Sequence, residues 1–145
     1  MKIYTRESHT DHRFSLHDAG ILAFVRDGDD LVLETDSGFV DVVRDEMVKG
    51  RIRICNVWFS DSYVHVLHYR DVLCGNVGSF TGKKMTLADF VVEFSKNRSR
   101  MDVMGEYDGD QTLVLTGFVT TGERIAEVLM EIDYTGDFLY EIKED

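Results

Sequence analysis

Short apolar runs alternate with tight turns rich in glycine and aspartate along most of this chain. The clearest example is an apolar run at residues 21–25, the turn residues Asp27-Gly28-Asp29-Asp30 and a second run at 31–35. An Asp-Gly pair between two such runs is the strongest short signal for a β-hairpin, because glycine accepts the positive φ that the turn requires. The pattern therefore predicts a chain built mainly from antiparallel strands.

The same pattern predicts a turn at Asp36-Ser37-Gly38 into a strand over residues 39–43, and three further hairpins. Each of these hairpins has two β-like runs around a short polar turn: 51–59 with 63–69, 101–107 with 112–119, and 126–134 with 138–142. The expected turns are Ser60-Asp61-Ser62, Asp108-Gly109-Asp110 and Thr135-Gly136-Asp137.

Residues 126–134 alternate between apolar and mostly acidic side chains, which is the period of a strand with two different faces. The apolar face has Ala126, Val128, Met130, Ile132 and Tyr134, and the other face has Glu127, Leu129, Glu131 and Asp133. The spacing of the apolar residues from Ile125 to Ile132 also fits a helix. The turn and the β-like run that follow favour the strand.

A single helix is expected over residues 86–96. Thr86 can cap its N-terminus, and Asp89 three residues later gives a weak variant of the capping box. Lys96 lies in the last turn, where positive charge complements the helix dipole. An apolar stripe at helical spacing should face the sheet and consists of Leu87, Phe90, Val91 and Phe94.

About eight strands and one packed helix predict a mainly β (α+β) fold, either an antiparallel sandwich or a half-open barrel. A length of 145 residues is typical of one domain, so residues 1–145 are expected to form a single domain. The chain contains no proline, which argues against a Pro-rich linker.

The N-terminal residues contain no apolar stretch like a signal-peptide core, and no run approaches the length of a transmembrane helix. Cys55 and Cys74 are the only cysteines, and without a signal peptide both are expected to be free thiols, with Cys55 buried on a sheet face. These observations predict a cytoplasmic protein.

The net charge of −11 is concentrated in the last third of the chain. Residues 101–145 contain twelve acidic and two basic side chains, whereas the first hundred residues contain fifteen and fourteen. Such a surface repels nucleic acid and anionic membranes and attracts basic partners. The expected partner is a basic protein, with no nucleic acid and no membrane, while plain solubility is the simpler reason for the charge.

His9, His12 and His17, together with Asp11 and Asp18, form the densest group of side chains able to bind a metal. Imidazole and carboxylate suit zinc, but this spacing matches no known zinc geometry, so no metal and no cofactor are expected. His65 and His68 have an odd separation within one predicted strand and should point to opposite faces.

Residues 75–84 invite comparison with a phosphate-binding loop, but Val77 and Lys84 stand where that motif requires Gly and Ser or Thr. The segment is expected to be a connection into the helix. The aspartates around Gly28 lack the spacing of a calcium loop. The only basic concentrations are Lys49, Arg51 and Arg53, and Lys96, Arg98 and Arg100, in a chain whose pI is about 4.8.

Three segments carry a resemblance to a known group of proteins: Ser15-Leu16-His17-Asp18-Ala19-Gly20-Ile21, the hairpin residues Gly28-Asp29-Asp30-Leu31, and Glu131-Ile132-Asp133-Tyr134. The chain resembles small bacterial β-rich proteins that open with a His-Asp-Ala/Cys segment and end with such a strand pair. Some members of that group are similar to immunity factors that neutralise bacterial toxins. The resemblance implies a bacterial cytoplasmic binding module without established catalytic residues.

The function expected from the sequence is a non-enzymatic, immunity-like protein-binding module with an acidic sheet surface. Its predicted residues are Glu127, Leu129, Glu131, Asp133 and Glu141, joined by Glu106, Asp108 and Asp110 from another hairpin. Two alternatives stay open: a small metal-dependent hydrolase using His9, His12 and His17, and a structural homodimer joined at a sheet edge.

Overall fold

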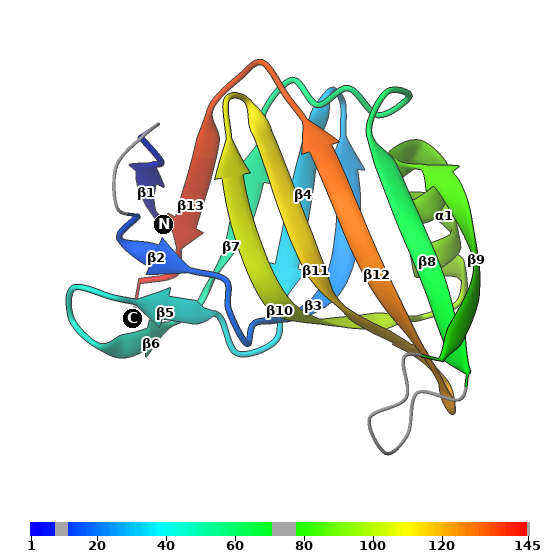
Figure 1. Ribbon diagram of the computed structural model, residues 1–145. Coiled ribbons are helices and arrows are strands. Elements are labelled where there is room, and N and C mark those ends of the chain that lie inside the picture. Colours follow the sequence, from blue (N-terminus) through cyan, green and yellow to red (C-terminus); the bar gives the residue numbers. More distant parts are fainter. Residues whose placement is uncertain (8–11, 71–77, 145) are drawn as a thin grey trace.

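The computed structural model describes residues 1–7, 12–70 and 78–144, and Figure 1 shows its elements. Within these residues the chain forms thirteen strands and one helix. In chain order they are β1 (Lys2–Thr5), β2 (Phe14–Ser15), β3 (Gly20–Asp27), β4 (Asp30–Thr35), β5 (Phe39–Asp41), β6 (Glu46–Val48), β7 (Gly50–Ile54), β8 (Tyr63–Arg70), β9 (Ser79–Thr86), α1 (Leu87–Lys96), β10 (Arg100–Gly109), β11 (Thr112–Thr121), β12 (Arg124–Asp133) and β13 (Phe138–Ile142).

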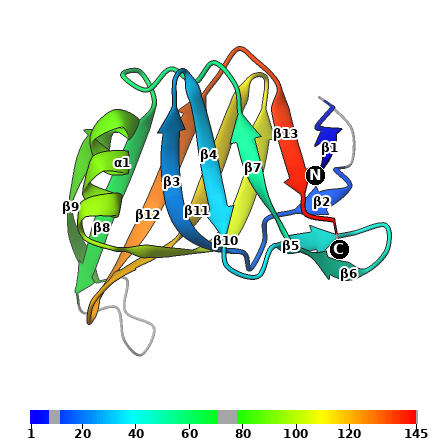
Figure 2. The same cartoon turned by 180° about the vertical axis from the view of Figure 1, so that it is seen from behind.

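Ten strands form one antiparallel sheet in the order β1-β13-β7-β4-β3-β10-β11-β12-β8-β9, and β2, β5 and β6 form a small second sheet. The large sheet has two halves, joined where β3 pairs with β10 through only two residue pairs. We call β1, β13, β7, β4 and β3 the first half, and β10, β11, β12, β8 and β9 the second half. The halves face each other, as the views from the front (Figure 1) and from behind (Figure 2) show. The sheet is not closed into a barrel, because β1 and β9 do not pair with each other.

The core lies between the two halves and forms one cluster. The first half contributes residues such as Leu33 and Ile52, and the second half contributes residues such as Val103 and Leu115, all fully buried. In β12 the alternate residues Val128, Met130 and Ile132 point to this core, as the alternation over residues 126–134 predicts. The mainly β class with one helix is therefore confirmed, although the described residues form thirteen strands and not about eight.

Helix α1 agrees closely with its prediction. Thr86 caps it, and its hydroxyl accepts a hydrogen bond of 3.2 Å from the backbone N–H of Asp89. The buried residues are the four of the predicted stripe, Leu87, Phe90, Val91 and Phe94. The helix packs on β3 of the first half and on β8 and β9 of the second half, so it covers the open side between them.

Two of the four predicted hairpins are confirmed. In the β3–β4 hairpin Asp27 pairs with Asp30 around Gly28, which has a φ of 62°. In the β10–β11 hairpin Gly109 pairs with Thr112, so the turn lies one residue later than expected and Gln111 takes the positive φ. The strand predicted after Gly38 is the short β5.

The other two predicted hairpins are wrong. Strand β7 pairs with β4 and β13, β8 pairs with β12 and β9, and β12 pairs with β11 and β8. The chain crosses between the two halves after β7 and again after β12. These two crossings hydrogen-bond to each other, from Cys55 N–H to Asp137 O at 2.8 Å and from Thr135 N–H to Asn56 O at 3.0 Å. Gly136 lies against Cys55, where an added Cβ would be only 2.6 Å from the Cys55 Cβ.

Two smaller expectations also need correction. Residues 79–84, expected as a connection, belong to strand β9, which pairs with β8 along its whole length. Cys55 lies just after β7 and is only partly buried, although it is a free thiol as predicted. Burial raises the pKa of this thiol, and the neighbouring Asp30 and Asp137 carboxylates add to the effect. Cys74 lies outside the described residues.

Candidate protein-binding surface

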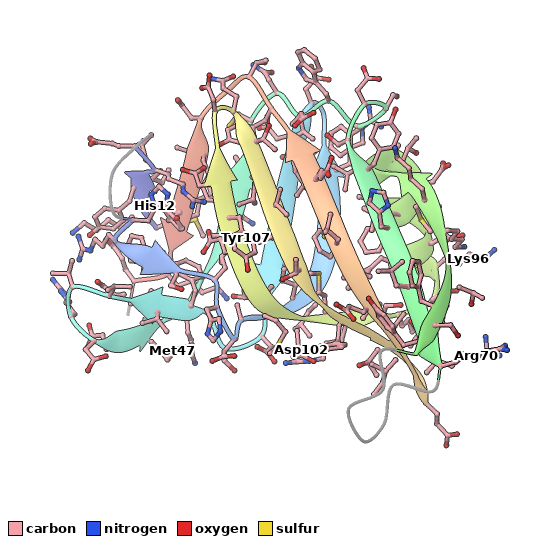
Figure 3. The ribbon with its side chains drawn as sticks, viewed as in Figure 1. His12, Met47, Arg70, Lys96, Asp102 and Tyr107 are labelled. Atoms are coloured by element: carbon pink, nitrogen blue, oxygen red, sulfur yellow. The ribbon has the colours of Figure 1, made fainter. Side chains whose placement is uncertain are left out.

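The predicted acidic surface lies on the outer face of the second half, which Figure 3 shows face on. Strand β12 places Glu127, Leu129, Glu131 and Asp133 on this face, because the alternate residues Val128, Met130 and Ile132 are buried in the core. In antiparallel pairs, residues directly opposite each other share a face. The pairings of β12 with β11 and β8 therefore identify its neighbours on the surface.

Apolar side chains from four strands surround Glu127. Glu127 pairs with Phe118 of β11 on one side and with Leu67 of β8 on the other. Together with Tyr69 and Ile125, these two residues line an open hollow that also contains Glu127. Phe80 of β9 extends the group, since its ring centroid lies 5.8 Å from that of Tyr69. We call the five apolar residues the apolar patch: Leu67, Tyr69, Phe80, Phe118 and Ile125.

The apolar patch is exposed to an unusual degree for such large side chains. Ile125 and Phe80 are 65% and 61% accessible, and Tyr69 and Phe118 are about two-fifths accessible. Single exposed apolar residues are normal, but contiguous ones mark interaction sites. The sequence alone gives no signal for this patch, because its members are brought together by strand pairing across four strands.

The Glu127 carboxylate has no basic partner within the described part of the chain. Glu127 interacts with Tyr69: burial raises the pKa of the Tyr69 phenol, and the charge and hydrogen bonding of Glu127 raise it further. Glu131 is exposed and likewise lacks an ion pair with any described residue. Asp133 is different, because Thr112 Oγ1 donates to its carboxylate at 2.8 Å. Leu129 is half-buried between Thr116 and His65.

Glu141 does not belong to this surface. It lies on β13 in the first half, where it is only 6% accessible, and it accepts hydrogen bonds from Arg51 at 2.8 Å and Arg53 at 3.4 Å. Its expected position beside β12 depended on the hairpin that does not form. Both edges of β12 are occupied by β11 and β8, so β13 is held instead by β7 and β1.

Glu106 and Asp108 also point away from the predicted surface. Met101 and Val103 of β10 face the core, but a β-bulge between Val103 and Gly105 inserts one extra residue into the strand. After the bulge, Glu106 and Asp108 pair with the inward-facing Leu115 and Leu113. One inserted residue therefore reverses which side chains face outward. Of the three expected carboxylates on this hairpin, only Asp110 is exposed at the turn without an ion pair in the described residues.

The inward-facing carboxylates of β10 hold the N-terminal segment. Glu106 forms a largely buried ion pair with Arg6 at 3.0 Å and accepts a hydrogen bond from the Leu16 N–H. His12 Nε2 lies 3.0 Å from the Asp108 carboxylate, and the exposed His17 lies beside Asp18 at 3.1 Å. His9 and Asp11 lie outside the described residues. In the described part of the chain no group of three or more His, Cys, Asp or Glu side chains could hold a metal ion.

The other residues considered as parts of a site do not come together in one place. His65 and His68 point to opposite faces as predicted, since His65 pairs with Leu129 on the outer face and His68 lines a pocket on the inner face. Arg51, Arg53 and Arg100 are all ion-paired with carboxylates. Among the described residues, no helix has the length and apolarity needed to cross a bilayer.

No family model matches this chain, and neither a curated protein nor a solved structure matches it. The inference about function therefore depends on the geometry of the described residues.

Proposed function

We propose that this protein is a non-enzymatic protein-binding module whose partner docks on the outer face of the second half. The observation that carries the proposal is Glu127, a carboxylate without a basic partner in the described residues, at the centre of the apolar patch. The proposed surface consists of the apolar patch with Glu127, Leu129 and Glu131. A partner that fits it presents a lysine or arginine within an apolar surface, and that cation pairs with Glu127.

This arrangement matches the general anatomy of protein interfaces. Aromatic residues are enriched at interface centres, and polar residues form the rim. Here Phe118, Tyr69 and Ile125 lie in the centre, and Glu131 lies toward the rim. Four strands of eight to ten residues present a projected area on the order of 500 Å². This area approaches the roughly 800 Å² that one side of a standard interface buries.

The net negative charge of the protein favours a basic partner. A net charge of −11 draws a basic partner toward the protein over long range and raises the association rate. The immunity-like role and the cytoplasmic location, which come from the sequence, belong to this proposal as its biological setting. The folded-over sheet would act as a sandwich-like scaffold for the surface.

The two alternatives have less support. The hydrolase alternative uses His9, His12 and His17. His12 and His17 are each paired with a different carboxylate, and His9 lies outside the described residues. The homodimer alternative uses a sheet edge. The long edge strand β9 has two exposed lysines, Lys83 and Lys84, and charges of this kind oppose edge-to-edge pairing.

The test compares matched pairs of variants on the two outer faces. Phe118→Ser with Ile125→Ser removes the centre of the apolar patch. Val25→Ser with Ile3→Ser is the control, since these residues are exposed on the first half. Each chain is used to capture partners from the source cell, and a captured protein is then purified for affinity measurement. We expect the wild-type and control chains to bind it, and the patch variant to lose binding.

A second measurement tests the charge. Glu127→Lys with Glu131→Lys should slow association of the purified partner and flatten its dependence on salt. The proposal is wrong if the patch variant captures the same proteins with the same affinity as the wild type. It is also wrong if the chain captures only itself, which would favour the homodimer.

A further inference from the structure

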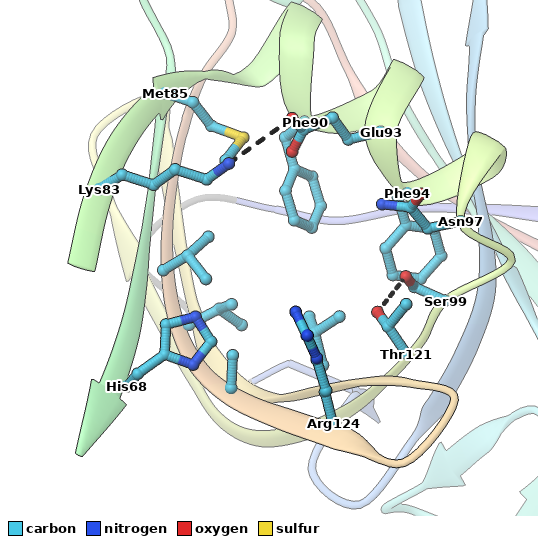
Figure 4. A pocket seen from close by; sticks show the side chains of 14 residues that line it. His68, Lys83, Met85, Phe90, Glu93, Phe94, Asn97, Ser99, Thr121 and Arg124 are labelled. Atoms are coloured by element: carbon cyan, nitrogen blue, oxygen red, sulfur yellow. Dashed lines mark hydrogen bonds and ion pairs between the residues drawn. The ribbon is translucent and has the colours of Figure 1, made fainter. Parts of the chain in front are cut away.

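A pocket of about 240 Å³ lies on the inner side of the second half, beneath helix α1 (Figure 4). One wall is the helix, and the others are the strands β8, β9, β11 and β12 with the chain that follows the helix. The pocket is separate from the proposed binding surface, which lies on the opposite face of the same strands. Most of the polar residues around it come from strand ends and from the last turn of α1.

The floor of the pocket is apolar. Phe90 and Phe94 project from α1 with ring centroids 5.6 Å apart, and both rings also pack on Phe24 of the first half. Met85 and Val128 complete the floor from the sheet. Because these side chains belong to the packed core, the floor is preformed and offers water no polar partner. Such a floor suits the apolar body of a ligand.

Four of the polar side chains at the rim are paired with one another. Lys83 Nζ lies 3.6 Å from the Glu93 carboxylate, and the hydroxyls of Ser99 and Thr121 are 2.6 Å apart. Figure 4 shows both pairs, one on each side of the pocket. The charges of Lys83 and Glu93 therefore neutralise each other, and the two hydroxyls are uncharged.

Arg124 is the charged rim residue without an ion pair in the described part of the chain. It is the first residue of β12, and it shares the inner face with Ala126 and Val128 because alternate residues of a strand face the same way. Its guanidinium points into the pocket (Figure 4), and it forms no hydrogen bond or ion pair with any described residue. By contrast, Arg6, Arg13, Arg51, Arg53 and Arg100 each bind a carboxylate.

We propose that this pocket binds a small carboxylic acid with an aromatic or aliphatic body. The carboxylate pairs with Arg124, whose planar guanidinium can donate two parallel hydrogen bonds to it. The body lies against Phe90 and Phe94. The volume is below the roughly 300–1,000 Å³ of pockets that hold drug-sized ligands, so the ligand is small.

The test is a titration of the labelled full chain followed by nuclear magnetic resonance of its backbone amides. The probes are phenylacetate, indole-3-acetate and octanoate, with phenylacetamide as the uncharged match and inorganic phosphate as the anion without an apolar body. We expect at least one acid to shift amides around the pocket, whereas phenylacetamide and phosphate leave them unchanged. No shift with any acid at about 10 mM, where even a millimolar site is mostly occupied, overturns the proposal.

Two variants test the charge of Arg124 and the shape of the pocket separately. Arg124→Met keeps the length of the side chain but removes its charge, and it should weaken binding about tenfold or more. Ala126→Leu fills the pocket and should abolish binding without changing any charge. Arg44→Met, an exposed arginine on the small sheet, is the control and should bind like the wild type. Equal binding by the Arg124→Met variant would show that the acid is held elsewhere. Because the outer face is unchanged in all three variants, these results are independent of the proposed protein partner.

Discussion

The two halves of the large sheet share one core, but their outer faces differ in how their charged side chains are paired. On the first half, Arg51 and Arg53 of β7 bind Glu141 of β13, and they also reach carboxylates on β4 and on the β3–β4 turn. On the second half, Glu127 lies among exposed apolar side chains without a cation in reach among the described residues. On the first face Glu141 is paired with two arginines of the neighbouring strand, whereas Glu127 and Glu131 on the second face have no ion pair with any described residue.

This difference supports the proposal that the outer face of the second half binds a partner. An outer face whose ions are paired across neighbouring strands is stable in water by itself. An exposed apolar patch around an unpaired carboxylate does not stabilise the fold in this way. Clustered carboxylates weaken the fold slightly, because they repel one another. The apolar patch and the unpaired Glu127 lie together on the second half, and variants on the two halves test that contrast.

The largest effect is expected where α1 joins the halves. Phe90 is almost fully buried and its ring packs on Phe24 of the first half at 5.4 Å. Phe90→Ala should lower the free energy of unfolding by about 3–5 kcal/mol. Urea denaturation measures this change, with Val92→Ala on the exposed side of the helix as the control. A midpoint unchanged from that of the control would mean that α1 does not hold the halves together.

A smaller loss is expected from the ion network of the first face. Glu141→Gln leaves Arg51 and Arg53 without their shared carboxylate. The expected loss is about 2 kcal/mol, below the roughly 3–5 kcal/mol for a fully buried pair because both arginines stay partly hydrated. Urea denaturation at neutral pH, with the exposed Glu144→Gln as a reference, measures it. Equal stability of the two variants would contradict the inference that the ion pairs of Glu141 stabilise this face.

The junction between the halves should respond to pH. Arg100 of β10 donates a hydrogen bond to Asp36, which follows β4, and this bond lowers the pKa of the Asp36 carboxyl. A lowered pKa contributes stability above the unfolded value of about 3.9, and that stability is lost as the pH falls through the folded value. Both side chains are partly exposed, so Asp36→Asn should cost less than about 1 kcal/mol at neutral pH. The stabilities of wild type and variant should converge as the pH falls below the unfolded value and through the folded pKa of Asp36. A constant difference across this range would contradict the assignment.

The smallest effect on stability is expected in the apolar patch. Ile125→Ser should change the free energy of unfolding by no more than about 0.5 kcal/mol, because the side chain already lies mostly in water. Thermal denaturation checks this value. A loss of several degrees in Tm would show that Ile125 packs in the fold and is not free for a partner.

The sequence predicted the features that depend on neighbours along the chain. The cap at Thr86 and the stripe of α1 depend on a few residues in one helical segment. The β3–β4 hairpin depends on Gly28, and the buried face of β12 depends on simple alternation. It also placed Glu127 and Glu131 correctly on the outside.

The candidate sites, in contrast, depend on residues far apart in the chain. A polar turn such as 135–137 shows that the chain bends, but not which strand the next segment joins. For that reason Glu141 was expected beside β12, whereas β13 pairs with β7 and β1. The bulge in β10 has no clear sequence signal, yet it turns Glu106 inward to Arg6.

What the sequence by itself determined is the class of the fold, its helix and the alternation of each strand, because these follow from local backbone geometry and side-chain period. Only the tertiary structure decided which strands are neighbours. That decision brought Phe118, Leu67 and Phe80 around Glu127, and it placed Arg124 beneath Phe90 and Phe94. The physical reason is that pairing partners are selected by burial of one shared core, which involves the whole chain at once.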